Sequence, residues 1–422
     1  MQTVSGPVNG KVRPPGSKSL TNRALLCAAM ANGQSVLAGA LVSDDTHVMI
    51  ESLGRLGISV ESLLGGTRLL VDGCGGVIPK AEANLFVDNS GTTVRFLTAA
   101  LALSGGMYRL DGVERMRQRP IGPLVEALKK LGVSIVAESP GGCPPVAIKS
   151  VRALSRETEI AGDVSSQYLS GLLLGSPLAA NGLEVSISGA CVSWPYVEMT
   201  RCVMASFGVE VGLDSSKGGA QVAAGQTYRA AEYQIEPDAS AASYFWAVAA
   251  ICGGCVRVDG LNIDSLQGDI RFVEALKGMG CFVEYHDDAI SVIGQARQGI
   301  DIDMADFSDT AQTLAVVALF VEGSTRITGV AHNRVKETDR IGNLAIELRK
   351  LGAEVDEHSD GLTIHPPKQL QPARLETYSD HRMAMSFALA GLKQSGVEIA
   401  DPGCVAKTFP NYFQVLAELV GQ

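Results

Sequence analysis

Residues 127–136 read ALKKLGVSIV, an amphipathic helix that ends at a glycine and is followed directly by a short β-branched strand. The same phrase occurs four more times: SLGRLGISV (52–60), VMASFGVEV (203–211), ALKGMGCFVEY (275–285) and ELRKLGAEV (347–355). The glycines of successive copies are 75, 76, 72 and 72 residues apart. A constant period of this length indicates a repeated structural unit.

A second phrase repeats with the same period. It consists of an Ala/Leu-rich helix, a small turn and another strand, as in LALSGGMYRLDG (101–112). Six copies occur, and their turn glycines are 73, 76, 72, 69 and 73 residues apart: Gly33, Gly106, Gly182, Gly254, Gly323 and Gly396. Two independent phrases with one period predict six copies of an α/β unit, each with two helices that lead into strands.

The length of 422 residues is too great for one ordinary core, so the six repeats are expected to form two domains of three repeats each. The expected boundaries are a short N-terminal strand before Gly16 and the stretch 233–238 between the third and fourth repeats. The first domain would then span residues 17–235. The second would combine residues 1–16 with residues 236–422.

The composition restricts the partners and the location. Hydrophobic residues make up 46% of the chain and charged residues 19%, as in globular proteins. A net charge of −10 argues against nucleic acid or an anionic membrane as the main partner. No apolar run reaches the roughly 18 residues of a membrane span, and the N-terminus lacks targeting features, so a cytoplasmic location is expected.

The cysteines favour reduced thiols, because they are odd in number and scattered. The single CxxC, Cys252 to Cys255, lies on a Gly-Gly turn and is expected to contain buried thiols rather than a metal or redox pair. All nine are Cys27, Cys74, Cys143, Cys191, Cys202, Cys252, Cys255, Cys281 and Cys404.

Polar residues gather at the first helix of every repeat, whose starts are expected near residues 18, 91, 166, 239, 309 and 381. The Ser, Thr, Asn and Asp residues there are explained as N-caps. N-capping does not explain cations at these positions, because the positive end of a helix dipole disfavours them. Eight lie near helix starts: Lys18, Arg23, Arg95, Arg119, Lys336, Arg340, Arg382 and Lys407. Together with the free N–H groups of the helices, they predict a polyanion site.

Nucleotide and metal motifs do not account for this pattern. GSKS (16–19) has Ser17 where a phosphate-binding P-loop needs a glycine before the lysine, and the sequence contains neither GxGxxG nor a cluster with metal-ligand spacing. We therefore expect no metal and no cofactor.

Nine motifs occur in one order: PPGSKSLTNRALL (14–26), NSGTTVRFL (89–97), RQRPIGPL (117–124), SSQYLSGLL (165–173), VSWPY (192–196), FSDTAQT (307–313), RVKETDRI (334–341), SDHRMAM (379–385) and AKTFP (406–410). Together they resemble the EPSP synthase family over essentially the whole chain. The resemblance implies two α/β domains, each of three βαβαββ repeats about a local threefold axis (an inside-out α/β barrel), that close over the substrates. It also implies transfer of the enolpyruvyl group of phosphoenolpyruvate to the 5-hydroxyl of shikimate 3-phosphate.

The resemblance assigns site residues position by position. Shikimate 3-phosphate would contact Lys18, Ser19, Arg23, Ser165, Ser166, Gln167, Ser193, Tyr196, Asp309, His332 and Lys336. Phosphoenolpyruvate would contact Lys18, Asn89, Gly91, Arg119, Gln167, Glu337, Arg340, His381, Arg382 and Lys407. The resemblance implies that Asp309 takes the proton of the 5-hydroxyl and that Glu337 gives a proton to C3. Lys18 or Lys407 would share the proton transfers. The resemblance further implies a monomer that the inhibitor glyphosate binds in the phosphoenolpyruvate pocket, beside Gly91.

Two positions depart from the family pattern. His332 and Asn333 stand where some members have Asn-Trp, and Phe96 stands where plant-like members have Pro. The first departure affects the expected contact from His332, and the second could shift the helix that carries Gly91.

Two alternatives differ in testable ways. A sister transferase that acts on UDP-N-acetylglucosamine carries Asn where Ser19 stands and a reactive Cys near residues 115–119, where this chain has none. A non-catalytic polyanion-binding relative would not need Asp309 and Glu337, because carboxylates beside a phosphate site weaken binding. Phosphate release assays separate these functions.

Overall fold

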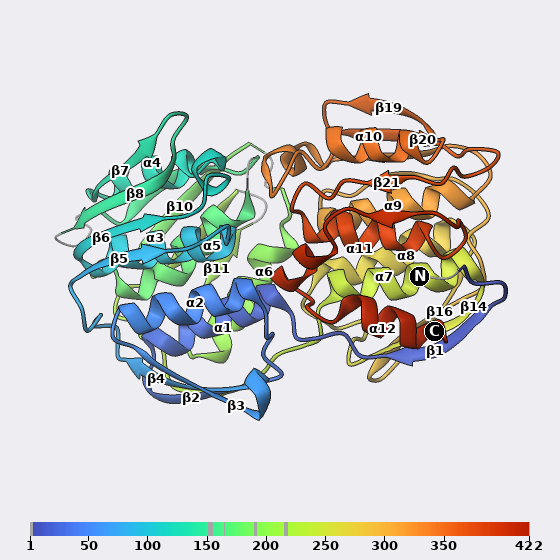
Figure 1. The fold of residues 1–422 in the computed structure, drawn as a ribbon. Helices are drawn as coiled ribbons and strands as arrows, with labels where there is room; N and C mark the ends of the chain where they lie inside the picture. The colour runs from blue at the N-terminus through green and yellow to red at the C-terminus, as the bar shows by residue number, and fades with distance from the viewer. Residues whose placement is uncertain (1–2, 151–154, 164, 190–191, 215–217, 422) are drawn as a thin grey trace. The chain divides into compact units, whose positions relative to one another are not determined.

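The computed structural model describes residues 3–150, 155–163, 165–189, 192–214 and 218–421. It divides into two compact domains. The N-terminal domain comprises Gly16–Ile235, and the C-terminal domain combines Met1–Pro15 with Glu236–Gln422. Each is described below by itself (Figure 1).

The second repeat has the complete βαβαββ order. Its elements are β5 (Glu82–Phe86), α3 (Gly91–Ser104), β6 (Gly106–Asp111), α4 (Gly122–Lys130), β7 (Ser134–Ser139) and β8 (Cys143–Ser150). Strand β5 pairs parallel with β6, which pairs antiparallel with β8, and β7 forms the other edge. The parallel strands β5 and β6 are joined by helix α3, as such a crossover requires, and the antiparallel strands β7 and β8 by a tight turn.

The third repeat has the same order: β9 (Glu157–Ala161), α5 (Ser166–Gly175), β10 (Leu183–Ser188), α6 (Pro195–Ser206), β11 (Gly212–Asp214) and β12 (Gly219–Val222). The first repeat takes its first strand from the far end of the domain: β13 (Glu232–Gln234), α1 (Lys18–Met30), β2 (Asn32–Ala38), α2 (Asp44–Arg55), β3 (Ser59–Leu63) and β4 (Arg68–Cys74). Strand β13 pairs parallel with β2, which closes the domain on itself.

The C-terminal domain follows the same plan and takes its first strand from the chain's N-terminus. The fourth repeat comprises β1 (Val8–Val12), α7 (Ala239–Cys252), β14 (Gly254–Asp259), α8 (Phe272–Gly278), β15 (Phe282–His286) and β16 (Ala289–Ile293). Strand β1 pairs parallel with β14. The fifth comprises β17 (Asp301–Asp303), α9 (Ala311–Val317), β18 (Thr325–Thr328), α10 (Gly342–Lys350), β19 (Glu354–His358) and β20 (Gly361–His365).

The sixth repeat is shorter. It comprises β21 (Arg374–Leu375), α11 (His381–Ala390), β22 (Glu398–Ile399) and α12 (Tyr412–Leu419), and its sheet contains only the parallel pair β21 and β22. Within the described residues, no strand follows α12.

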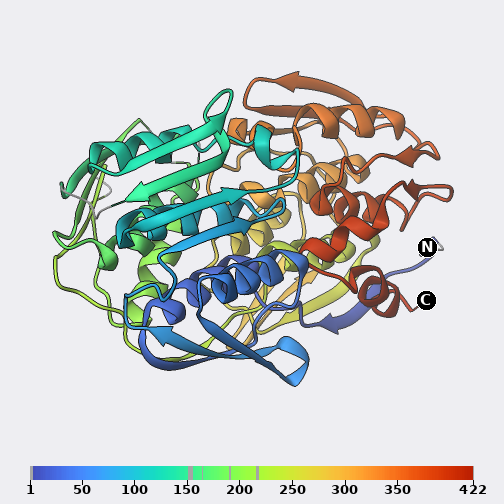
Figure 2. The ribbon, with the colours of Figure 1, turned by 60° about the vertical axis from the view of Figure 1, so that its left-hand side comes forward.

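The first helix of each repeat forms the centre of its domain. Helices α1, α3 and α5 contact one another in the N-terminal domain, and α7, α9 and α11 do so in the C-terminal domain. Helix α7, ASAASYFWAVAAIC, is buried along its whole length, as expected of a helix that is apolar or small on every side. The sheets lie outside these helices (Figures 1 and 2). The predicted inside-out α/β fold is confirmed.

The predicted helix starts are confirmed at five positions: Lys18, Gly91, Ser166, Ala239 and His381. At the fifth repeat a 3₁₀ turn, Ser308–Thr310, precedes α9, so the regular helix begins at Ala311. In the described residues no helix is both long and apolar enough to cross a membrane.

The eight cysteines within the described residues are free thiols. Cys252 is buried as expected, whereas Cys255 is only partly buried. Cys191 lies outside the described residues.

Candidate active site

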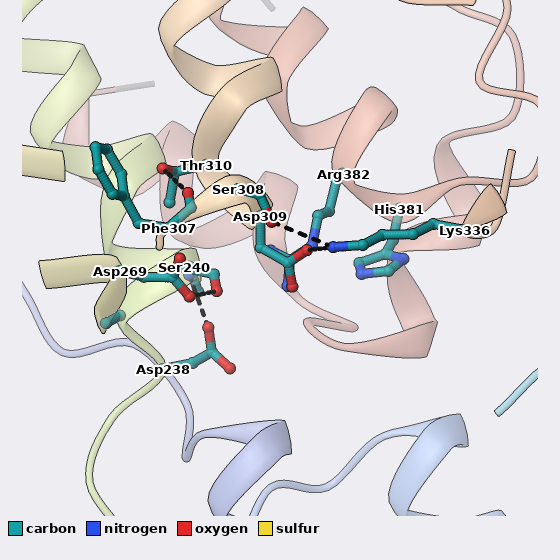
Figure 3. A network of polar contacts seen from close by, with 12 residues as sticks. Asp238, Ser240, Asp269, Phe307, Ser308, Asp309, Thr310, Lys336, His381 and Arg382 are labelled. Atoms are coloured by element: carbon teal, nitrogen blue, oxygen red, sulfur yellow. Dashed lines mark hydrogen bonds and ion pairs between the residues drawn. The ribbon is translucent and has the colours of Figure 1, made fainter. Parts of the chain in front are cut away.

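Asp309 is the centre of an ion-pair network in the C-terminal domain. Its Oδ1 lies 2.6 Å from Lys336 Nζ and 3.3 Å from Arg340 Nη1, and its Oδ2 lies 2.7 Å from Arg382 Nη2. Figure 3 shows Lys336 and Arg382 converging on this carboxylate from two different segments. Together with three further residues these groups form what we call the cationic cluster: Asp309, Lys336, Glu337, Arg340, Asp380, Arg382 and Lys407.

Arg340 joins the three carboxylates of the cationic cluster. Its side chain is only 2% exposed, and it makes two bonds to Asp380, from Nε at 2.7 Å and from Nη2 at 3.1 Å. Nη2 also donates to Glu337 at 2.8 Å. Burial lowers the pKa of Arg340, but the neighbouring carboxylates outweigh burial and raise the pKa above its ordinary value. Arg340 is therefore a fixed cation that is held in one orientation.

Glu337 has a different environment from Asp309. It is 7% exposed on its side chain, accepts from Arg340 through Oε2, and has Lys407 Nζ 3.3 Å from Oε1. Asp309 is 16% exposed and contacts three cations. Two carboxylates with different surroundings can carry out different proton transfers in one reaction.

His332 and Lys336 meet at Ser308, in the 3₁₀ turn before α9. His332 Nε2 lies 2.8 Å from Ser308 Oγ, which also accepts from Lys336 Nζ at 3.5 Å. Burial, and then the Lys336 charge, lowers the pKa of His332 to about 3. Burial also lowers the pKa of Lys336, against the opposing effect of Asp309. His332 is therefore neutral at physiological pH, and it is a hydrogen-bonding group rather than a cation.

The eight cations near helix starts predict an external anionic partner. In the C-terminal domain, protein carboxylates contact four of these cations, Lys336, Arg340, Arg382 and Lys407, so an external anion is not their only partner. Four cations and three carboxylates leave the cationic cluster with one excess positive charge. An anionic substrate would have to compete with Asp309 and Glu337 for these cations.

Arg23 fulfils a structural role in the N-terminal domain. It donates from Nε to Thr200 Oγ1 at 2.7 Å, from Nη1 to the Ser19 carbonyl at 3.0 Å, and from Nη2 to Ser170 Oγ and the Tyr196 carbonyl. Burial lowers its pKa to about 10. Four of its five N–H groups are used in this way, so Arg23 mainly fixes Ser19 and Tyr196, two predicted substrate contacts.

Arg119 lies against the start of α3. It is buried, and its Nη1 donates to the Asn89 carbonyl at 2.9 Å and to Asn89 Oδ1 at 3.0 Å. A Cβ on Gly91 would lie 2.5 Å from Arg119 Nη2 and 2.9 Å from Cζ. Gly91 is thus required for the guanidinium of Arg119 to occupy its place.

Arg95 is also used within the N-terminal domain. It donates to Gln167 Oε1 at 2.5 Å and to the Pro120 carbonyl at 3.2 Å, and it stacks over the Tyr168 ring at 5.2 Å. These contacts join α3, α5 and the turn that ends at Arg119. Arg95 therefore supports the site and is not available in this arrangement as a direct anion ligand.

The remaining predicted residues of this domain lie at helix starts. Lys18 and Ser19 occupy the first turn of α1, and Ser165 caps α5 by accepting from the Gln167 backbone N–H at 3.3 Å. Ser166 is buried in the same turn, and Ser193 and Tyr196 lie at the start of α6. Ser193 has a φ of 56°, a left-handed conformation that is uncommon outside glycine.

The model of the family described as EPSP synthase (3-phosphoshikimate 1-carboxyvinyltransferase) matches residues 3–416. The chain belongs to the EPSP synthase family. The chloroplastic 3-phosphoshikimate 1-carboxyvinyltransferase of Arabidopsis thaliana is 45% identical over 429 residues, which cover 98% of this chain and 82% of that relative. The enzyme of the same name from Trichormus variabilis is 46% identical over 420 residues, covering 99% of this chain and 98% of the relative.

Solved structures agree with this family membership. An EPSP synthase from Acinetobacter baumannii has a TM-score of 0.81 at 26% identity and covers 99% of this chain and 97% of its own. The enolpyruvyl transferase NikO from Streptomyces tendae has a TM-score of 0.77 at 18% identity. The match covers 99% of this chain and 96% of the NikO chain, which shows a common fold.

Some residues that hold the cationic cluster and its surroundings were not identified from the sequence. Asp380 orients Arg340, Ser308 joins His332 to Lys336, and Ser170 and Thr200 hold Arg23. Asp380 and Ser308 lie inside motifs already noted, SDHRMAM and FSDTAQT, so comparison of equivalent helix starts could have found them. His381 is fully buried, with Nδ1 3.7 Å from Asp380 Oδ1.

Proposed function

We propose that the chain transfers the enolpyruvyl (carboxyvinyl) group of phosphoenolpyruvate to the 5-hydroxyl of shikimate 3-phosphate, with Asp309 and Glu337 as the acid–base pair. Family membership over nearly the whole chain supports the reaction. The observation that carries the residue assignment is the presence of these two carboxylates, in different environments, within one cluster of four cations.

The reaction has two balanced steps. In the addition, the 5-hydroxyl oxygen attacks C2 of phosphoenolpyruvate, the hydroxyl proton passes to Asp309, and C3 gains a proton that Lys407 supplies through Glu337. In the elimination, Glu337 takes a proton from C3 and returns it to Lys407, the double bond re-forms, the C2–O bond to phosphate breaks, and the proton on Asp309 leaves with the phosphate. Lys407, 3.3 Å from Glu337, can share that proton transfer.

Binding follows from charge. Phosphoenolpyruvate carries a carboxylate and a phosphate, and a planar guanidinium can grip either with two hydrogen bonds. Arg340, Arg382 and Lys407 are the proposed partners in the C-terminal domain, and Arg119 with Asn89 in the N-terminal domain. The proposed partners of shikimate 3-phosphate are Lys18, Ser19, Arg23, Ser165, Ser166, Gln167, Ser193, Tyr196, Asp309, His332 and Lys336.

The same cations stabilise the charge that develops on the tetrahedral intermediate and on the departing phosphate. Phosphoenolpyruvate is already activated, so this scheme uses no cofactor. Glyphosate is a proposed inhibitor that competes with phosphoenolpyruvate, and a monomer is the proposed assembly.

Phosphate release from phosphoenolpyruvate tests the proposal. We expect release with shikimate 3-phosphate as acceptor and only background release with UDP-N-acetylglucosamine. Phosphate release from phosphoenolpyruvate with UDP-N-acetylglucosamine as acceptor, and none with shikimate 3-phosphate, would establish the activity of the sister transferase. Binding of both substrates without release would establish a non-catalytic relative. Glu337→Gln, tested in parallel, should retain binding and lose turnover.

A further inference from the structure

The segment that leads into α11 contains an unusual turn. Tyr378 and Ser379 are consecutive, and both have a φ of 54°, in the left-handed region that residues other than glycine rarely adopt. Asp380, His381 and Arg382 follow directly, and two of these belong to the cationic cluster. A turn of this kind persists only where its surroundings hold it in place.

Glu347, on α10, provides that restraint. Its side chain is fully buried, its Oε1 accepts from the Tyr378 hydroxyl at 2.7 Å, and its Oε2 accepts from the Glu376 backbone N–H at 3.0 Å. Lys350 Nζ donates to both oxygens, at 2.9 and 2.7 Å. One carboxylate thus binds the entering segment at two points, on either side of Thr377.

A second contact joins the same two segments within the cationic cluster. Arg340, two residues before α10, makes its paired bonds to Asp380. Glu347 lies within α10 and Arg340 just before its first residue, and both contact the entering segment. The segment from Glu376 to Asp380 is therefore fixed at both ends along α10.

We propose that Glu347 and Tyr378 are positioning residues that hold Asp380 and Arg382 in register with Arg340, and so shape the phosphoenolpyruvate side of the cationic cluster. This inference rests on the proposed function. A purely packing role would not need a buried carboxylate, because an apolar side chain of similar volume fills such a place at no desolvation cost. The carboxylate is explained by the geometry that its hydrogen bonds impose.

Tyr378→Phe is the principal test. It removes one hydroxyl from a side chain that is partly exposed, so the fold should survive. Loss of a hydrogen bond to a charged group should raise the KM for phosphoenolpyruvate about tenfold. The KM for shikimate 3-phosphate and the melting temperature should stay near the wild-type values, a separation that general destabilisation would not produce.

Tyr285→Phe is the matched control. The Tyr285 hydroxyl also donates to a glutamate, Glu274 on α8, but neither residue belongs to the segments that carry the cationic cluster. All kinetic constants should be unchanged in this variant. Glu347→Gln is a second probe. If it folds, it should raise the KM for phosphoenolpyruvate, and the double variant with Tyr378→Phe should show less than the product of the two single effects, because both changes weaken the contact between Tyr378 and Glu347.

The outcomes separate this inference from the proposed function. Wild-type protein without phosphate release in the presence of shikimate 3-phosphate would refute the function. The positioning role is tested independently by isothermal titration with phosphoenolpyruvate alone, where Tyr378→Phe should weaken binding about tenfold. A Kd and a KM for phosphoenolpyruvate within about twofold of wild type would overturn the positioning role.

Discussion

The place of an aspartate within its helix start decides what its carboxylate does. Asp238 and Asp380 each accept a backbone N–H of the helix that follows, at 2.8 and 2.9 Å, and so serve as N-caps. Asp309 lies in a 3₁₀ turn at the equivalent place, and its oxygens contact three cations. Its carboxylate therefore lies among the cations of the cationic cluster.

Asp309→Asn keeps the shape of the side chain and removes the proton acceptor. We expect kcat to fall by about 10²- to 10⁴-fold, the usual contribution of a general base. Binding of shikimate 3-phosphate should change much less, because the carboxylate acts mainly in the transition state. Steady-state phosphate release and isothermal titration measure the two effects. Near-normal turnover would refute the assignment.

His332 provides a pH test. Its pKa falls from 6.5 to about 3 on folding, so between these values the unfolded chain binds a proton that the folded protein does not. The stabilising contribution is complete above pH 6.5 and is lost as the pH falls. At pH 5 the loss amounts to about 2 kcal/mol.

Urea unfolding at pH 7.5 and 5.0 measures this contribution. Wild type should lose more stability between the two pH values than His332→Asn, which has no imidazole to protonate. An equal loss in both proteins would show that His332 is not buried in its neutral form.

At the scale of secondary structure elements, the start of α3 determines the position of a predicted binding residue, Arg119. Helix α3 begins at Gly91 as predicted, and Phe96 is fully buried beneath Arg23, with 5.1 Å from the guanidinium carbon to the ring centre. Phe96 thus lies in the regular helix α3 and belongs to the core of the N-terminal domain. A Cβ on Gly91 would come closest to Arg119 and next to Arg95, 3.1 Å from its Nη1.

Gly91→Ala should therefore act first through Arg119. The added methyl group displaces the guanidinium, a clash of about 1–3 kcal/mol or roughly ten- to hundredfold in affinity. Both the KM for phosphoenolpyruvate and the inhibition constant of glyphosate should rise, the latter more, because glyphosate is the longer molecule. Gly122→Ala is the control, since its Cβ would meet only ordinary contacts at 3.7 Å. Unchanged constants in Gly91→Ala would contradict the contact.

At the scale of the whole molecule, each domain is closed by a strand from a distant part of the chain. β13 follows the third repeat and completes the first, and β1 precedes all repeats and completes the fourth. Val8 and Val12 of β1 are buried in the core of the C-terminal domain. That domain therefore cannot be complete without the first residues of the chain.

Val8→Asp with Val12→Asp should unfold the C-terminal domain selectively, because two buried unpaired carboxylates cost several kcal/mol. The chain has two tryptophans, and Trp246 in α7 is fully buried in that domain. In a Trp194→Phe background, its fluorescence should report a much lower urea midpoint. Lys11→Asp, at an exposed position of β1, is the control. Equal midpoints would show that β1 contributes little.

The repeat, five of the six helix starts and the types of charged group at the site follow from the sequence alone. These features are local: a glycine after the helix, a cap before it and an apolar pattern within it act over a few residues. Family motifs added the candidate residues, because each motif is a short run at a helix start.

Which charged groups meet depends on the tertiary structure. Arg23 reaches Thr200 across 177 residues of sequence, and Arg340 reaches Asp380 across 40. Helix packing brings these groups together, and whether a buried cation then pairs with a carboxylate, a carbonyl or a substrate depends on differences of an ångström. No periodicity records such distances, because long-range side-chain geometry is set by the packed core as a whole.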